Sequence, residues 1–152
     1  MQLQLTFTND PRCTASVRAF THETLRQSPL DDATAEKLGE CVLAAATNAI
    51  EHAYPAGQEG SIELTFREQG GRLEFLVRDF GLPVDVAELE RHLHDADSPT
   101  HKKVALPWPG ADVVDEVHWI GYGREGKAIQ LIKWLHDEHV ATAPADPGPR
   151  GS

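Results

Sequence analysis

Cysteines are scarce in this 152-residue chain, which contains only Cys13 and Cys41. Each lies in a stretch with helical patterning, and the two lack the close spacing that marks a metal site or a redox motif. We therefore expect reduced thiols in or near the core. A chain of this length can bury roughly 70 % of the surface exposed by its unfolded form. Since 40 % of the residues are apolar, one core can form without disulfides.

Basic residues are also few, with 14 Lys and Arg against 24 Asp and Glu, for a formal net charge of -10. Nucleic acids and anionic lipids attract basic patches. We therefore expect neither direct nucleic-acid binding nor membrane binding, and a basic protein surface is the more natural partner for this chain.

Long apolar runs are missing as well. No run approaches the roughly 18 residues of a membrane span, and the N-terminus lacks the basic start and apolar stretch of a signal peptide. These absences predict a cytoplasmic protein.

Residues 1–136 are expected to form one domain, and residues 137–152, which are proline-rich and without apolar patterning, are expected to form a disordered tail.

The N-terminal part predicts a strand over 2–8, where apolar and polar residues alternate. A helix is expected over 11–27, with Asp10 as its cap and Pro11 at its first position. The second helix is expected over 33–54, where apolar residues recur every three or four positions, with Asp31 or Asp32 as its cap.

The remaining pattern predicts two hairpins and a long connection. The expected elements are strands at 61–67 and 72–78, a helix at 84–94, a loop at 95–110, a short helix at 111–115, and strands at 116–121 and 128–134. This order favours an α+β fold, a two-layer sandwich in which helices cover one face of a mixed, mostly antiparallel sheet.

Three residues stand out as candidates for chemistry. Asn48 lies at the edge of the apolar stripe of helix 33–54, where an amide needs a partner or a cavity. Asp79 lies where a strand ends, and Gly81 permits a close backbone approach. A carboxylate at such a place can accept a hydrogen bond from an exocyclic amine such as that of adenine, and an Asn carbonyl can coordinate Mg²⁺.

These segments resemble the nucleotide site of the GHKL (Bergerat-fold) ATPases, and most closely that of the anti-sigma-factor serine kinases of bacteria. Residues 45–54, A-A-T-N-A-I-E-H-A-Y, look like the Asn box of that family. Residues 78–85, R-D-F-G-L-P-V-D, look like its first glycine box, and the closing hairpin with L-I-K-W-L at 131–135 is also similar. The resemblance covers about residues 1–136.

The resemblance implies the GHKL fold, with ATP and Mg²⁺ as cofactors. Asn48 would be the Mg²⁺ ligand, Asp79 would read adenine, and Gly81 would let the backbone approach the base. His52 matches the histidine of the family motif, with a hydrogen-bonding role at the helix end as the alternative.

The chain departs from the family at the catalytic position. The family has a glutamate four residues before the Asn, and Ala44 stands there. A methyl group can neither accept a proton nor orient a nucleophile. On a helix, Glu40 and Glu51 are each displaced by a turn or more from where the side chain of Ala44 points. No catalytic residue is therefore assigned.

The phosphate-binding lid also differs. The family grips the triphosphate with backbone N–H groups, whereas Pro107 and Pro109 have none. The G-x-G-x-x-G at 121–126 lies between two expected strands and is interpreted as a hairpin turn. Lys102 and Lys103 on the long loop are candidates for phosphate binding, with ordinary solvated lysines as the alternative.

The resemblance thus predicts an ATP-binding regulator that acts by partner switching with a sigma factor or a STAS-type anti-anti-sigma protein, with a homodimer expected from the family. Two alternatives stay open: an active serine/threonine kinase of an anti-anti-sigma factor, and a nucleotide-free adaptor on the same fold.

Overall fold

The computed structural model describes residues 1–81, 87 and 106–135. The elements are β1 (Gln2–Thr8), α1 (Cys13–Arg26), α2 (Asp32–His52), β2 (Ser61–Gln69), β3 (Arg72–Asp79), the 3₁₀ turn η1 (Ala111–Val113), β4 (Glu116–Gly121), the 3₁₀ turn η2 (Gly123–Glu125) and β5 (Lys127–Trp134). The expected helix at 84–94, most of the loop at 95–110 and the tail at 137–152 lie outside the described residues.

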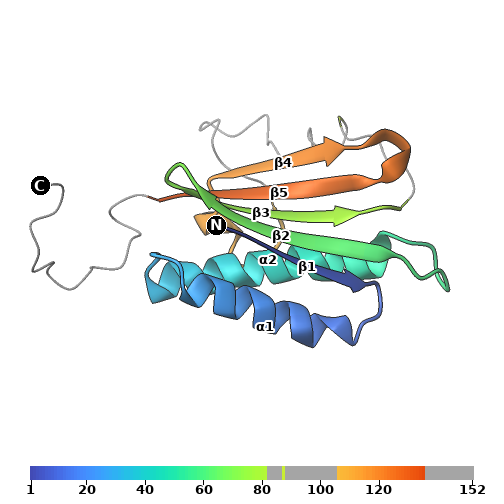
Figure 1. Cartoon of the computed structure of the whole chain (residues 1–152), viewed down its shortest axis with the longest axis horizontal. Coiled ribbons are helices and arrows are strands. Elements are labelled where there is room, and N and C mark those ends of the chain that lie inside the picture. The colour runs from blue at the N-terminus through green and yellow to red at the C-terminus, as the bar shows by residue number, and fades with distance from the viewer. Residues whose placement is uncertain (82–86, 88–105, 136–152) are drawn as a thin grey trace, which may run out of the picture.

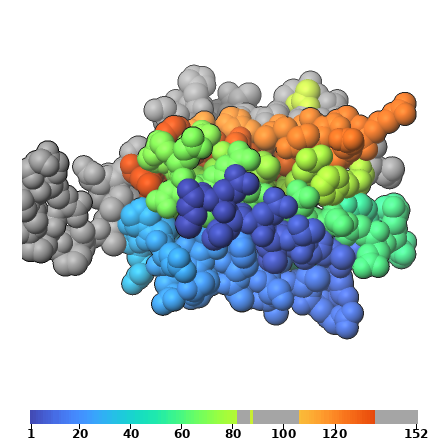
Figure 2. Space-filling view, viewed as in Figure 1, coloured from blue at the N-terminus to red at the C-terminus, as the bar shows by residue number. Residues whose placement is uncertain are grey.

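The strands form one five-stranded sheet in the order β1-β2-β3-β5-β4, and every neighbouring pair is antiparallel. Figure 1 shows α1 and α2 packed below one face of this sheet. In the space-filling view of Figure 2, the dark blue N-terminal residues lie between the helical layer and the green β2–β3 hairpin. The expected α+β two-layer architecture is confirmed.

The core lies between the sheet and α2. The register pairs Phe66 with Phe75 and Leu64 with Val77, so their buried side chains share the face that is turned toward the helices. Because side chains alternate along a strand, Asp79 at the end of β3 lies on this same face. The fold therefore carries a carboxylate at the margin of its apolar layer.

The start of α2 agrees with the sequence, whereas the start of α1 does not. Asp31 caps α2, since its carboxylate accepts a hydrogen bond from the backbone N–H of Thr34 at 2.7 Å. The helix α1 begins only at Cys13, and its cap residue is Arg12, without a side-chain cap. The carboxylate of Asp10 instead binds both the backbone N–H and the guanidinium of Arg12. The helix therefore begins two residues later than predicted, and the carboxylate of Asp10 caps the turn that precedes it, since the Arg12 N–H lies two residues ahead.

Candidate functional site at the end of strand β3

The carboxylate of Asp79 is enclosed, and the residue is only 4 % exposed. Its Oδ1 accepts a hydrogen bond from the backbone N–H of Gly81 at 3.0 Å. Its Oδ2 lies 2.8 Å from the Nζ atom of Lys127. Lys127 therefore neutralises the charge of this carboxylate inside the protein, and the two hydrogen bonds fix the orientation of the carboxylate group.

Gly81 presses the chain after β3 onto the end of α2. A Cβ at this position would lie 2.1 Å from the carbonyl oxygen of Ala53, which is closer than any real contact. Only glycine permits this approach. The contact sets the distance between the strand end that carries Asp79 and the helix that carries Asn48.

Tyr54 fixes the same corner through its hydroxyl group. The hydroxyl accepts a hydrogen bond from the backbone N–H of Phe80 at 2.9 Å and donates one to the carbonyl of Ser61 at 2.5 Å. Burial raises the pKa of Tyr54 above its ordinary value, so the hydroxyl keeps the proton that it donates. Gly60 leaves room for the ring, because a Cβ there would lie 2.2 Å from its Cζ atom.

Gly126 brings Lys127 beside Asp79. The φ angle of Gly126 is 92°, and a Cβ on this residue would lie 2.0 Å from the backbone carbonyl oxygen of Asp79. The next residue, Lys127, pairs with Asp79 in the β3–β5 register. Sequence reasoning missed Lys127. The available signal was a lysine in line with Ile129 and Leu131, at a strand position where an apolar residue is expected.

Asn48 lies on the edge of α2 that is turned away from α1. Gly39 faces α1, since a Cβ there would lie 3.3 Å from Leu25. The row of Lys37, Ala44 and Asn48 follows the other edge, where the carbonyl of Lys37 meets Gly110.

The side chain of Asn48 is half-buried. Within residues 1–81, 87 and 106–135 its amide forms no hydrogen bond, which leaves its carbonyl oxygen available to a ligand. Ala44, one turn earlier, is half-buried on the same edge.

The other predicted residues do not join this arrangement in the described part of the chain. The side chain of His52 is 70 % exposed, and its Nε2 lies 3.6 Å from the carboxylate of Glu51. Glu40 is exposed as well, as expected for the solvated face of a helix. Lys102 and Lys103 lie outside the described residues. The segment 121–126 connects β4 to β5 through η2, which confirms its interpretation as a hairpin turn.

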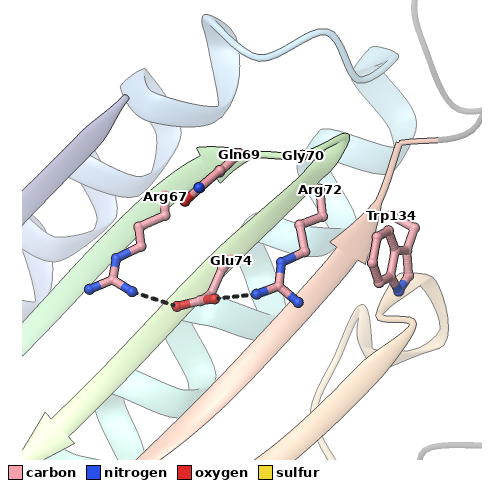
Figure 3. A pocket seen from close by; sticks show the side chains of 6 residues that line it. All are labelled: Arg67, Gln69, Gly70, Arg72, Glu74 and Trp134. Carbon is pink, nitrogen blue, oxygen red and sulfur yellow. Dashed lines mark hydrogen bonds and ion pairs between the residues drawn. The ribbon is translucent and has the colours of Figure 1, made fainter.

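A hollow lies at the other end of β3, on the sheet face opposite the helices. It measures about 310 Å³ and is lined by Arg67, Gln69, Gly70, Arg72, Glu74 and Trp134. Figure 3 shows the buried carboxylate of Glu74 between the guanidinium groups of Arg67 and Arg72, at 3.7 and 3.3 Å. The two guanidinium groups neutralise the Glu74 carboxylate and leave one positive charge in excess, and none of the predicted site residues lies there.

No group of three or more His, Cys, Asp or Glu side chains in residues 1–81, 87 and 106–135 is arranged to hold a metal ion. Over the same ranges, no helix has the length and apolar character that crossing a membrane requires. A Mg²⁺ ion bound largely by phosphate oxygens and water needs only one or two protein ligands.

The antiparallel sheet with helices on one face places the chain among the two-layer α+β domains. Residues 7–140 match the model of the histidine kinase-like ATPase domain, and the chain belongs to this family. Comparison with curated protein sequences gave no significant match.

Two solved structures are similar to the chain. The crystal structure of the RsbU and RsbW domains of Rv1364c from Mycobacterium tuberculosis is 21 % identical, with a TM-score of 0.59 over 89 % of this chain. This chain spans about a third of the chain in that structure, 32 % of its length, and the likeness shows the fold. The mycobacterial sensor histidine kinase MprB is 16 % identical, with a TM-score of 0.46 over 87 % of this chain and 97 % of its own.

Proposed function

We propose that this domain is an ATP-binding regulator of the anti-sigma type, which binds Mg-ATP between the end of β3 and the outer edge of α2. The observation that carries the proposal is the buried carboxylate of Asp79, held by the Gly81 N–H at the point where the chain touches α2. Asp79 would accept the hydrogen bond of the adenine amine. Asn48 would supply a carbonyl ligand to Mg²⁺, which in turn neutralises phosphate charge.

The described residues support this assignment in two ways. The amide of Asn48 is half-buried and unengaged within the described residues, as a ligand to a bound ion would be before binding. The glycine at position 81 leaves no side chain between the strand end and the helix. Lys102 and Lys103 remain candidates for the triphosphate, and His52 is a weaker candidate because its ring is exposed beside Glu51.

Phosphotransfer is not part of the proposal. Ala44 is half-buried on the same edge of α2 as Asn48, where a catalytic carboxylate would be needed, and it offers no proton acceptor. The domain would instead act by binding a protein partner in a nucleotide-dependent way. The resemblance to anti-sigma kinases, and a fold shared with a structure that contains an RsbW domain, favour a sigma factor or a STAS-type protein as this partner.

Calorimetric titration with Mg-ATP tests the nucleotide site. We expect the wild type to bind, and Asn48→Ala and Asp79→Asn to weaken binding by about tenfold or more, since each removes a contact to a charged or strongly polar group. Glu51→Gln, at an exposed position near the end of the same helix, is the matched control and should bind as the wild type does. Absence of heat and of thermal stabilisation at millimolar nucleotide would leave only the nucleotide-free adaptor.

A transfer assay separates the regulator from the kinase. The domain is incubated with labelled ATP and a STAS-type partner, and the partner is examined for label. We expect no label with the wild type, and a signal with Ala44→Glu, which places a carboxylate one turn before Asn48. Efficient labelling by the wild type would show that the kinase alternative is correct.

A further inference from the structure

The hollow at the hairpin end of β3 is built by two neighbouring strands. The turn between β2 and β3 is Gly70–Gly71, and its φ angles of 62° and 74° suit a two-residue hairpin. The register beyond this turn pairs Arg67 with Glu74, and Arg72 lies two residues before Glu74 on the same strand. The three charged side chains therefore leave the sheet on one face.

Glu74 holds both guanidinium groups in place. Its side chain is only 8 % exposed, whereas those of Arg67 and Arg72 are 47 % and 37 % exposed. Figure 3 shows the two cations on either side of this carboxylate. A buried acid thus anchors two partly exposed cations, and the hollow keeps one positive charge in excess on a chain whose formal net charge is -10.

Most N–H donors of these two cations have no partner in the described part of the chain. A guanidinium has five N–H donors in one plane. Arg67 donates from Nε to Gln2 at 3.0 Å, and Arg72 donates to Glu74 at 3.3 Å. The contact of Arg67 with Glu74 is a longer ion pair of 3.7 Å. The hollow therefore offers charged donors in the planar arrangement that binds carboxylate oxygens.

Trp134 adds an apolar wall beside the cations. The guanidinium of Arg72 lies 5.7 Å from the centroid of its ring, and the residue is 36 % exposed. The ring nitrogen donates to Glu116, whose carboxylate also lies 3.4 Å from His118, so this acid is engaged outside the lining of the hollow. A hollow of about 310 Å³ has room for roughly ten water molecules, which exceeds the size of one inorganic anion.

We propose that this hollow is a docking site for an acidic segment of a protein partner. Carboxylate side chains of the segment contact Arg67 and Arg72, and a neighbouring apolar side chain contacts Trp134. Charge complementarity supports this occupant, because the hollow is locally positive although the chain as a whole is acidic. The hollow lies at the opposite end of β3 from Asp79, so the inference goes beyond the proposed nucleotide site and does not depend on it.

Fluorescence anisotropy with two labelled peptides tests the site. One is a short glutamate-rich peptide with a single leucine, and the other has glutamine in place of each glutamate. The net charge of the protein repels the acidic peptide, so its binding reports a local positive site. At low ionic strength, where ion pairs are least screened, the wild type should bind the glutamate peptide at least about tenfold more tightly than the glutamine peptide.

Substitutions locate the binding on the protein. Arg67→Gln and Arg72→Gln should each weaken binding of the glutamate peptide by about fivefold or more, because each removes a planar charged donor. Glu74→Gln keeps both cations and raises the local charge by one, so binding should strengthen by up to about fivefold. Arg124→Gln is the matched control, since it makes the same change in net charge as the other arginine variants at an exposed position in the β4–β5 turn, at the other end of the sheet.

The remaining outcomes overturn the proposal. Peptide binding that every variant retains places the contact elsewhere. Unchanged or weaker binding by Glu74→Gln does the same, and this comparison still decides if the loss of an arginine unfolds the chain. Inorganic phosphate is titrated in parallel by tryptophan fluorescence, and phosphate binding without peptide binding identifies a small-anion site instead. Because no nucleotide is present, failure here leaves the proposed function standing, and failure of Mg-ATP to bind leaves this site standing.

Discussion

The Tyr54 hydroxyl holds the corner of the molecule on which the proposed site depends, and Tyr54→Phe removes only that group. Two hydrogen bonds are lost, one from the Phe80 N–H at 2.9 Å and one to the Ser61 carbonyl at 2.5 Å. A hydrogen bond contributes about 0.5–1.5 kcal/mol net. The free energy of unfolding should therefore fall by about 1–3 kcal/mol. Since Phe80 lies between Asp79 and Gly81, ATP affinity should fall as well.

Urea unfolding followed by circular dichroism measures the stability effect. With an m-value of about 1–3 kcal/mol/M, the midpoint should move down by about 1 M. Tyr122→Phe is the control, because its ring lies over the guanidinium of Arg78 and the hydroxyl can be removed without loss of that contact. It should change stability by less than about 0.5 kcal/mol. Equal midpoints for Tyr54→Phe and the wild type would refute the idea that the hydroxyl ties these segments together.

Gly126→Ala should lower the free energy of unfolding by more than about 2 kcal/mol, because a side chain at φ 92° is strained and its Cβ would strike the Asp79 carbonyl. Gly123→Ala, at φ 61° with open space around it, should cost about 1–2 kcal/mol, and equal melting temperatures for the two variants would contradict the contact argument. Iodoacetamide at pH 8 should modify the half-buried Cys13 before the buried Cys41, which mass spectrometry of the folded and unfolded chain can check. Burial raises the pKa of the Cys41 thiol from 9.0 to about 12. The thiol therefore ionises at lower pH in the unfolded chain than in the folded one. The contribution of Cys41 to the free energy of unfolding should be lost as the pH rises from about 9 toward 12.

The sequence was sufficient for elements with strong apolar periodicity. The helix α2 and the β2–β3 hairpin follow from apolar spacing alone, and both lie close to their expected bounds. The start of α1 could not be predicted in the same way, because the carboxylate of Asp10 had two possible partners. It binds both the backbone N–H and the guanidinium of Arg12, and residue types alone do not decide in which turn the regular helix begins.

The candidate site likewise combines residues that the sequence proposed with one that it missed. The motif resemblance proposes Asn48 and Asp79, whose roles stay predictions, and it carries no information on what lies beside them. Lys127 was missed because β5 is buried on both faces, with Ala128 on one and Ile129 on the other. The alternation of apolar and polar residues along β5 therefore did not reveal on which face of the sheet Lys127 lies. Only the pairing of β5 with β3 places Lys127 against Asp79.

Gly81 and Gly110 both contact α2, and they bound the connection between β3 and η1. Gly81 meets the carbonyl of Ala53, and Gly110 meets the carbonyl of Lys37. These carbonyls are sixteen residues apart, or about 24 Å along a helix, whereas the chain from one glycine to the other could extend about 95 Å. Both ends of the connection thus contact the same helix, α2. The extended length of the connecting chain is about four times the distance between its two contact points. Asn48 lies between the two anchor points, so both ends of the connection are held by contacts on the helix that carries the residue proposed to bind the metal ion.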